Sequence, residues 1–352
     1  MTQFNKILVI GPAWVGDMVL AQSLFKTLKI NQPNCIIDVA APAWTLPLLE
    51  RMPEVSGKIA LPFKHGELAF WQRIKFGKSL TNAGYSQAII LTNSFKSALL
   101  PWAAGIPKRT SFLGEMRYGL INDVRSLDKT KLKKTVERFV ALGLAKGQEL
   151  PQTIPNPALV NDFAAAQIVL DKFALTTALT PTLSRGEREQ RVLGLCPGAE
   201  YGAAKRWPAE YYAQVANEAL NKGWQVWLFG SVADVAVTTK INQLCQNKCT
   251  DFGGKTKLGE AIDLMSLCDT IVSNDSGLMH IAAALNKQLI AIFGSSDPTH
   301  TPPMSPNAVI EYLGLPCSPC FKRKCPLTGD AHLRCLTDIK PKQIALKIVY
   351  TQ

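Results

Sequence analysis

The chain has 352 residues, more than one hydrophobic core usually serves, which predicts two domains. With 47% hydrophobic and 19% charged residues, its composition excludes wholesale disorder. Lys and Arg outnumber Asp and Glu by 39 to 27, and the net charge of +12 favours anionic partners such as phosphates or an acidic membrane surface. Nucleic acid is not expected, because no basic stripe is interleaved with aromatic residues.

The sequence contains no uncharged apolar run of about 18 residues, so no transmembrane helix is predicted. The N-terminus shows no clear signal-peptide cleavage site, and we therefore expect a cytoplasmic protein. Its nine cysteines are too sparse for a disulfide scaffold.

The first predicted elements are a buried strand over residues 7–10, a glycine turn and a helix over residues 21–28. Ligands of open α/β sheets bind at the carboxyl ends of strands, so this turn is a candidate functional loop. Gly11 and Gly16 lack the G-x-G-x-x-G spacing of a dinucleotide site, and the carboxylate of Asp17 would repel a phosphate. In the alternative interpretation, Asp17 only caps the helix.

Strands and helices continue to alternate through the first half of the chain. Strands are predicted over residues 35–40, 55–62 and 87–91, and helical segments over 42–53, 67–80 and 94–104, the last capped by Asn93 or Ser94. This alternation predicts a parallel sheet with helices on both faces. We expect residues 1–157 to form a Rossmann-like domain.

The segment over residues 158–190 is predicted to link two domains. It begins with a helix over residues 158–173, and the polar stretch over residues 176–190 has neither a helix nor a strand period. We expect that stretch to be an exposed, disordered insert.

The second half repeats the pattern and predicts a second Rossmann-like domain over residues 191–340. Strands are expected over 192–196, 225–229, 270–273 and 289–293, and helices over 209–220, 232–244 and 276–285. A last amphipathic helix over residues 341–350 could pack onto the first domain.

Two strand-ending loops of the second half favour an anion. In the first, Gly198 and its small neighbours leave backbone N–H groups accessible, and Lys205 precedes a helix. In the second, Asp275, Ser276 and Gly277 open a helix whose first N–H groups and dipole attract phosphate. His280, one turn further on, could donate a hydrogen bond to phosphate or be a buried core histidine. Asp275 could likewise be only the helix cap.

A third loop carries Asp234, which could hold a sugar hydroxyl, although helix capping by Ser231 explains the pattern equally well. Together the three loops predict a site for a nucleotide diphosphate.

Four thiols lie within nineteen residues near the C-terminus and could close a tetrahedral zinc site; they are Cys317, Cys320, Cys325 and Cys335. The second pair lacks the usual C-x-x-C spacing, so we expect no metal and keep a structural zinc as the alternative. No G-x-S-x-G elbow of a Ser-His-Asp hydrolase is present.

Four segments of the chain resemble those of the ADP-heptose–lipopolysaccharide heptosyltransferases, glycosyltransferase family 9. They read GPAWVGDM at residues 11–18, PGAEYGAAKRWP at 197–208, NDSGLMH at 274–280 and PCSPCFKRKCP at 316–326. The resemblance implies a GT-B fold, in which two Rossmann-like domains with parallel sheets face a central cleft. It further implies an acceptor on the N-terminal domain, a nucleotide sugar on the C-terminal domain, and inversion at the anomeric carbon.

Within the family, the resemblance is greatest to members that transfer heptose from ADP-L-glycero-D-manno-heptose to the first heptose of heptosyl-Kdo-lipid A. Such a reaction needs no added cofactor. It also implies a peripheral protein on the inner face of the inner membrane, which agrees with the basic charge.

Carried over by position, the resemblance makes Asp17 the general base, with Trp14 and Gly16 beside it on the acceptor side. Lys205 corresponds to a phosphate-binding lysine, and the segment from Asp275 to His280 corresponds to the donor loop. The chemistry agrees, because inverting transfer needs a carboxylate to take the acceptor proton. Cations beside the leaving ADP stabilise charge that grows in the transition state.

Three alternatives remain open. The first is the heptosyltransferase that adds the first heptose, or another core glycosyltransferase. The second is a GT-B-like sugar-nucleotide epimerase, which binds nucleotide sugars without an acceptor. The third is a non-enzymatic basic module that binds anionic lipid.

Overall fold

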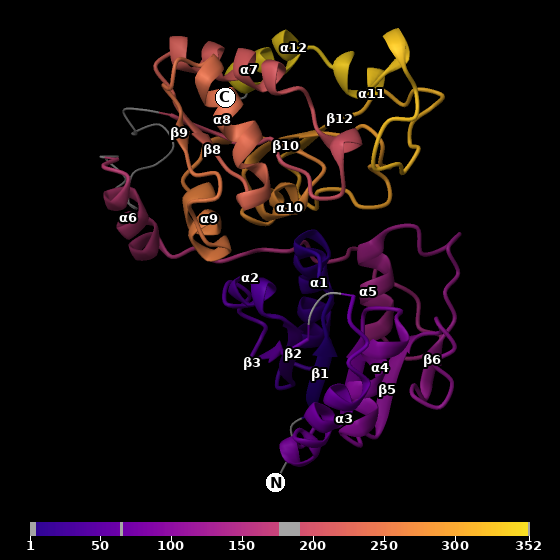
Figure 1. Ribbon diagram of the computed structural model, residues 1–352. Helices are drawn as coiled ribbons and strands as arrows, with labels where there is room; N and C mark the ends of the chain where they lie inside the picture. Colours follow the sequence, from indigo (N-terminus) through magenta and orange to yellow (C-terminus); the bar gives the residue numbers. More distant parts are fainter. Residues whose placement is uncertain (1–4, 64–65, 176–190, 351–352) are drawn as a thin grey trace. The chain divides into compact units, whose positions relative to one another are not determined.

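A computed structural model describes residues 5–63, 66–175 and 191–350 (Figure 1). The insert predicted over residues 176–190 lies outside the described residues. The chain divides into two compact units, unit 1 from Met1 to Ala158 and unit 2 from Leu159 to Gln352. In its described part, each unit contains one six-stranded sheet.

Unit 1 is built on a sheet with the strand order β3-β2-β1-β4-β5-β6, in which all neighbouring strands are parallel. In this order the strands are Gly57–Leu61, Ile36–Pro42, Lys6–Ile10, Gln87–Ile90, Lys108–Phe112 and Asp123–Arg125. The central strand β1 is apolar and buried because helices cover both faces of the sheet. Parallel pairing places the carboxyl ends of all these strands at one edge.

The helices of unit 1 cover both faces of this sheet, as predicted (Figure 1). They are α1 (Val15–Asn31), α2 (Leu46–Leu49), α3 (Phe70–Lys78), α4 (Phe95–Ala103) and α5 (Thr135–Gly143). α3 and α4 pack on the face that presents Leu8 and Ile90. α1 packs against α5 so closely that a Cβ on Gly143 would lie 2.3 Å from Leu24 Cδ1.

Two helix starts in unit 1 differ in detail from the capping that the sequence suggested. Helix α1 begins at Val15 with Trp14 at the N-cap position, so Asp17 lies within the first turn and does not cap the helix. Ser94 occupies the N-cap position of α4, but its side chain makes no capping hydrogen bond. The hydroxyl of Ser97 instead donates to the carbonyl oxygen of Ser94 at 2.6 Å.

Unit 2 has the strand order β12-β11-β10-β7-β8-β9, again with parallel neighbours. In this order the strands are Ala308–Glu311, Gln288–Ile292, Thr270–Asn274, Val192–Cys196, Gln225–Leu228 and Thr250–Asp251. β10, β7 and the last four residues of β11 are buried. The order reverses beside β7, which is where open α/β sheets bind ligands.

The helices of unit 2 lie on both sides of its sheet, with α7, α8 and α12 on one side and α9 and α10 on the other (Figure 1). They are α6 (Phe163–Lys172), α7 (Ala209–Asn221), α8 (Val235–Leu244), α9 (Leu258–Met265), α10 (Gly277–Ala284), α11 (Arg334–Thr337) and α12 (Pro341–Tyr350).

Two segments that the sequence did not assign to unit 2 belong to it. Helix α12, for which the sequence left packing onto the first domain open, packs within unit 2, where Ile344 and Ile348 are buried in the core beside α7. Helix α6, predicted as part of a linker, packs against α9. The residues before it are bonded to unit 2, since Leu159 N donates to Ala284 O at 3.0 Å and Asn161 Nδ2 to Ser266 Oγ at 2.9 Å.

Across the described residues, none of the helices combines the length and the apolar character that a membrane span requires.

Candidate active site

The candidate donor site is built from loops at the carboxyl ends of β7, β8, β10 and β11 in unit 2. Asn274, the last residue of β10, connects two of these loops. Its Oδ1 accepts from Trp207 N at 3.1 Å and from the Tyr212 hydroxyl at 3.0 Å, and its Nδ2 donates to Pro197 O at 2.7 Å. Asn274 is fully buried, so these bonds fix the loop after β7 against β10.

Lys205 and Asp275 form an ion pair between these loops. The Lys205 ammonium donates to Asp275 Oδ2, and the Ser296 hydroxyl, which follows β11, donates to the same oxygen. The Asp275 side chain is 5% exposed and that of Lys205 is 18% exposed. Lys205 is therefore held in place before a ligand arrives.

Helix α10 begins immediately after this pair, and its first N–H groups have no partner inside the helix. Ser276 occupies the N-cap position without a capping side-chain bond. Asp275 is not the cap, because its carboxylate is bonded to Lys205 and Ser296. The N-terminus at Gly277 therefore remains available for an anion.

His280 lies in the first turns of α10 and is 5% exposed. Burial lowers its pKa to about 4, with the Lys205 charge acting in the same direction and the Asp275 charge opposing both. The imidazole is therefore neutral at pH 7. Its Nδ1 is buried without a hydrogen-bond partner in the described structure. The structure thus has the buried histidine that the sequence left as an alternative.

Gly198 and Asp234 meet at the loops after β7 and β8. A Cβ on Gly198 would lie 2.4 Å from the Asp234 carboxyl carbon, so only glycine fits there. Asp234 Oδ2 accepts from Ser231 N at 3.0 Å and from the Ser231 hydroxyl at 2.8 Å, which is the capping arrangement considered above. Asp234 Oδ1 is buried without a hydrogen bond and lies 3.6 Å from Arg206 Nη2.

Three residues that the prediction omitted also belong to this site. The Tyr201 ring lies 5.2 Å from Lys205 Nζ and 5.2 Å from Arg323 Cζ, so one ring contacts two cations. Ala204 N donates to Arg323 O at 3.1 Å, which joins the basic segment over residues 322–324 to the loop after β7. The third residue is Ser296. The sequence feature that could have indicated it is the Gly-Ser-Ser run over residues 294–296, which follows a buried strand.

The C-terminal cysteines have free thiols. Burial, together with the neighbouring thiols of Cys317, Cys320 and Cys325, raises the pKa of Cys335 to about 11. In the described segments, no three or more His, Cys, Asp or Glu side chains are grouped so that they could hold a metal ion.

The predicted acceptor-side residues lie in unit 1, at the carboxyl end of β1. Trp14 is 44% exposed, and Gly16 and Asp17 are half-buried at the start of α1. The structure therefore brings the predicted donor residues together in unit 2 and places the predicted base in unit 1.

Comparison with known proteins identifies the family. The family model of glycosyltransferase family 9 (heptosyltransferase) matches residues 73–330. Lipopolysaccharide heptosyltransferase 2 of Escherichia coli K12 is 47% identical over 348 residues, which cover 96% of both chains. Lipooligosaccharide heptosyltransferase 2 of Haemophilus influenzae is 45% identical over 351 residues, covering 97% of this chain and 98% of the relative.

Among solved structures, E. coli ADP-heptose lps heptosyltransferase II matches with a TM-score of 0.84 and 43% identity, covering 98% of this chain and 97% of the other. The predicted α/β fold with two Rossmann-like domains is thereby confirmed.

This chain belongs to glycosyltransferase family 9, and it is a glycosyltransferase, as its motifs predicted. Within the family it is similar over nearly its whole length to proteins named heptosyltransferase 2.

Proposed function

We propose that the protein is an inverting heptosyltransferase that moves heptose from ADP-L-glycero-D-manno-heptose to the first heptose of heptosyl-Kdo-lipid A. The main support for binding of the nucleotide sugar is the Lys205–Asp275 ion pair at the N-terminus of α10. A fixed cation and a helix N-terminus side by side suit a diphosphate. The acceptor half is supported by the similarity to proteins named heptosyltransferase 2.

In this mechanism, donor binding and leaving-group stabilisation belong to unit 2. Lys205 and the first N–H groups of α10 bind the diphosphate and stabilise the charge that ADP gains as its bond to heptose breaks. Neutral His280 contributes a hydrogen bond rather than a charge. Asp234, in the neighbouring loop after β8, holds a hydroxyl of the donor sugar.

Proton removal belongs to unit 1. Asp17 takes the proton of the acceptor hydroxyl as that oxygen attacks the anomeric carbon, and the C–O bond to ADP breaks on the opposite face. Trp14 and Gly16 lie beside Asp17 and contact the acceptor sugar. Neither step requires a metal ion.

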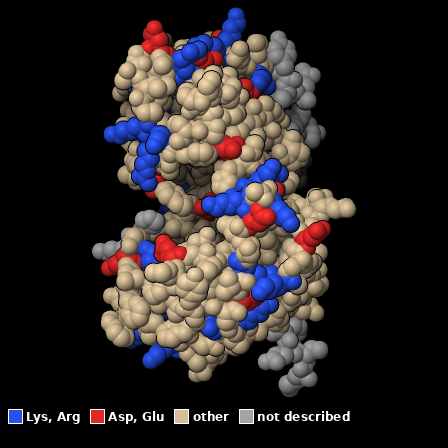
Figure 2. Space-filling view, turned by 90° about the vertical axis from the view of Figure 1, so that its right-hand side faces the viewer, with Lys and Arg blue, Asp and Glu red and all other residues tan. Residues whose placement is uncertain are grey.

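The protein acts at the inner face of the inner membrane, held there by its basic charge and its lipid acceptor. The net charge of +12 favours an anionic surface. On the face drawn in Figure 2, Lys and Arg side chains gather in patches, with acidic side chains beside some of them.

The proposal is tested by supplying ADP-heptose alone, with Kdo-lipid A, and with heptosyl-Kdo-lipid A, while ADP release and the lipid product are measured. We expect ADP release and a heavier lipid only with the heptosylated acceptor. Transfer to Kdo-lipid A would instead indicate the enzyme that adds the first heptose. Conversion of the donor without an acceptor would indicate an epimerase, and lipid binding without ADP-heptose binding a non-enzymatic module.

A further inference from the structure

The loop between β5 and β6, residues 113–122, exposes apolar side chains in an ordered part of unit 1. Leu113 is 42% exposed, Met116 is 81% exposed and Tyr118 is 72% exposed. A single exposed apolar side chain is common on protein surfaces. Three within six residues of one loop are more typical of an interaction site.

This loop is anchored by a fully buried arginine. Arg117 has no exposed surface, and it lies between the exposed Met116 and Tyr118. The acceptors of its guanidinium are the carbonyl oxygens of Thr92, Phe112 and Gly114 and the side-chain oxygens of Asn93, Ser97 and Ser111. A buried guanidinium is tolerated only when its donors are satisfied, so these bonds hold the loop in one shape.

The backbone of the loop is strained at two positions. Glu115 and Met116 adopt positive φ angles of 44° and 50°, which non-glycine residues rarely do. Glu115 also accepts a hydrogen bond from Phe95 N at 2.6 Å, which joins the loop to the start of α4. Such strain persists where the surroundings fix it, and it clusters at functional positions.

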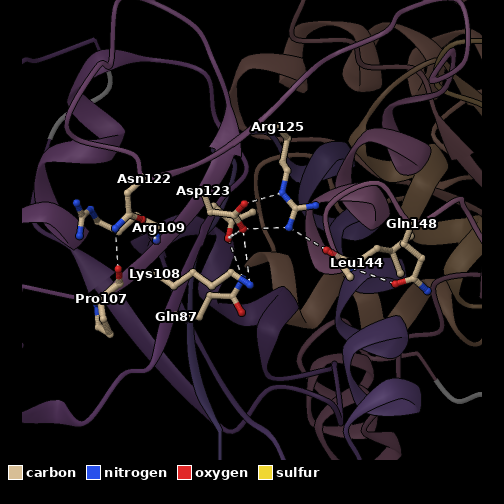
Figure 3. Close-up of polar contacts among 11 residues, drawn as sticks. Gln87, Pro107, Lys108, Arg109, Asn122, Asp123, Arg125, Leu144 and Gln148 are labelled. Carbon is tan, nitrogen blue, oxygen red and sulfur yellow. Dashed lines mark hydrogen bonds and ion pairs between the residues drawn. The ribbon is translucent and has the colours of Figure 1, made fainter.

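The strands on either side of the loop are also fixed (Figure 3). Asp123 of β6 accepts two hydrogen bonds from the Arg125 guanidinium, both at 3.0 Å, and lies 3.7 Å from the Lys108 ammonium of β5. Arg109 Nε donates to Leu120 O at 2.7 Å, and Asn122 Oδ1 accepts from Arg109 N at 2.8 Å. The apolar side chains are therefore held outward by a rigid loop.

The carboxyl edge of the sheet, where this loop begins, carries further groups suited to a membrane interface. Trp44 follows β2 and is 48% exposed, and its Nε1 donates to Ala13 O at 3.0 Å. The loop after β6 adds four exposed lysines, which are Lys129, Lys131, Lys133 and Lys134. Tryptophan and tyrosine favour the membrane interface, and lysines near an anionic surface each add attraction.

We propose that the β5–β6 loop is the contact of this protein with an anionic lipid bilayer, with Met116 and Tyr118 entering the interface and the lysines after β6 binding the headgroups. A bilayer fits better than a protein partner, because the loop begins at the sheet edge from which the run of cations after β6 also begins. This inference rests on the proposed function, in which the acceptor is a membrane lipid.

The test compares the Met116→Ser/Tyr118→Ser double variant with wild type in sedimentation with vesicles of phosphatidylcholine and phosphatidylglycerol. The matched control is Ile30→Ser, which removes a side chain that is 67% exposed at the far end of α1. We expect the vesicle partition coefficient to fall at least about tenfold in the double variant and by less than about twofold in the control. High salt should weaken wild-type binding.

Heptose transfer to a detergent-dispersed acceptor separates this inference from the proposed function. We expect the double variant to match wild type in detergent and to lose activity only when the acceptor is in vesicles. Unchanged vesicle binding, or an equal loss of activity in detergent, would overturn the lipid-contact role. Wild-type protein that binds vesicles through this loop but transfers no heptose in detergent would overturn the proposed function alone.

Discussion

Lys205 and Asp275 are 70 positions apart in the chain, yet their side chains form a largely buried ion pair at the carboxyl edge of the unit 2 sheet. The pair fixes a cation at the N-terminus of α10 without leaving an unpaired charge in the interior. The Ser296 hydroxyl, which also bonds Asp275, adds the loop after β11 to the same arrangement. Three strand ends are thus joined through one carboxylate.

Removing either partner of this pair should destabilise the protein, whereas removing both should cost much less than the sum. We expect Lys205→Met and Asp275→Asn each to lower the free energy of unfolding by roughly 1–3 kcal/mol, as measured by urea denaturation. The double variant should lose less than the sum of the two single changes, by an interaction energy of similar size. The control is the exposed Lys240–Glu210 pair, whose coupling should stay below about 1 kcal/mol. Additive effects at Lys205 and Asp275 would contradict the pairing.

His280 should make the stability of the protein fall on acidification. Its pKa is lowered from 6.5 to about 4 by burial, so below pH 6.5 the unfolded chain binds a proton that the folded protein does not. Relative to a His280→Asn variant, wild type should lose roughly 3 kcal/mol between pH 6.5 and 4 and no more below that range. Urea denaturation across this range measures it, and parallel profiles of the two proteins would refute it.

Gly198 should not tolerate a side chain while Asp234 is present. Its Cβ would lie 2.4 Å from the Asp234 carboxyl carbon, so Gly198→Ala must displace that carboxylate or the loop after β7. We expect a loss of about 1–3 kcal/mol in unfolding free energy, together with weaker ADP binding in calorimetry. In an Asp234→Ala background the same substitution should cost little. An equal cost in both backgrounds would exclude this clash as the cause.

Asp123 should stabilise unit 1 at neutral pH and cease to do so in acid. Burial raises its pKa, but hydrogen bonds from Arg125 and Thr110 and the charges of Arg125 and Lys108 outweigh this and lower the pKa overall. The ionised form is thus favoured by folding, and its contribution is lost as pH falls through the lowered pKa.

In thermal unfolding, Asp123→Asn should therefore be less stable than wild type at pH 7 by roughly 1–3 kcal/mol, and the difference should shrink below about pH 4. Glu50→Gln, at the exposed Glu50–Lys58 pair, should change stability little at either pH. A difference at Asp123 that does not depend on pH would contradict the electrostatic explanation.

The central strands of both sheets could be predicted because they are apolar runs buried on both faces. β1 and β7 are examples, and the predicted and observed ranges nearly coincide. The strands that were missed are short or polar. β9 has two residues, and β5 reads KRTSF. Thr110 and Ser111 of β5 are nonetheless fully buried, because Gln87, Asp123 and Arg117 bond their hydroxyls.

The donor site was predictable to the level of loops, because a glycine turn after a strand is a local signal. The contacts between side chains of different loops could not be predicted, because they join residues far apart in the chain. Sequence indicated Lys205 and Asp275 as separate anion-binding groups, and only the order of β7 and β10 in the sheet makes them neighbours. The contact of Tyr201 with Arg323 depends on a chain separation of more than a hundred residues, which no motif spacing encodes.

In the proposed mechanism, unit 2 binds the donor and Asp17 of unit 1 removes the acceptor proton. The most direct test is the turnover number of Asp17→Asn with heptosyl-Kdo-lipid A, measured beside its dissociation constant for ADP. Lys205→Ala is the comparison. It should weaken ADP binding and turnover together by about tenfold or more.

We predict that Asp17→Asn lowers turnover by about 10²–10⁴-fold while its affinity for ADP stays within about twofold of wild type. Normal turnover in that variant would contradict the proposed mechanism and exclude Asp17 as the general base.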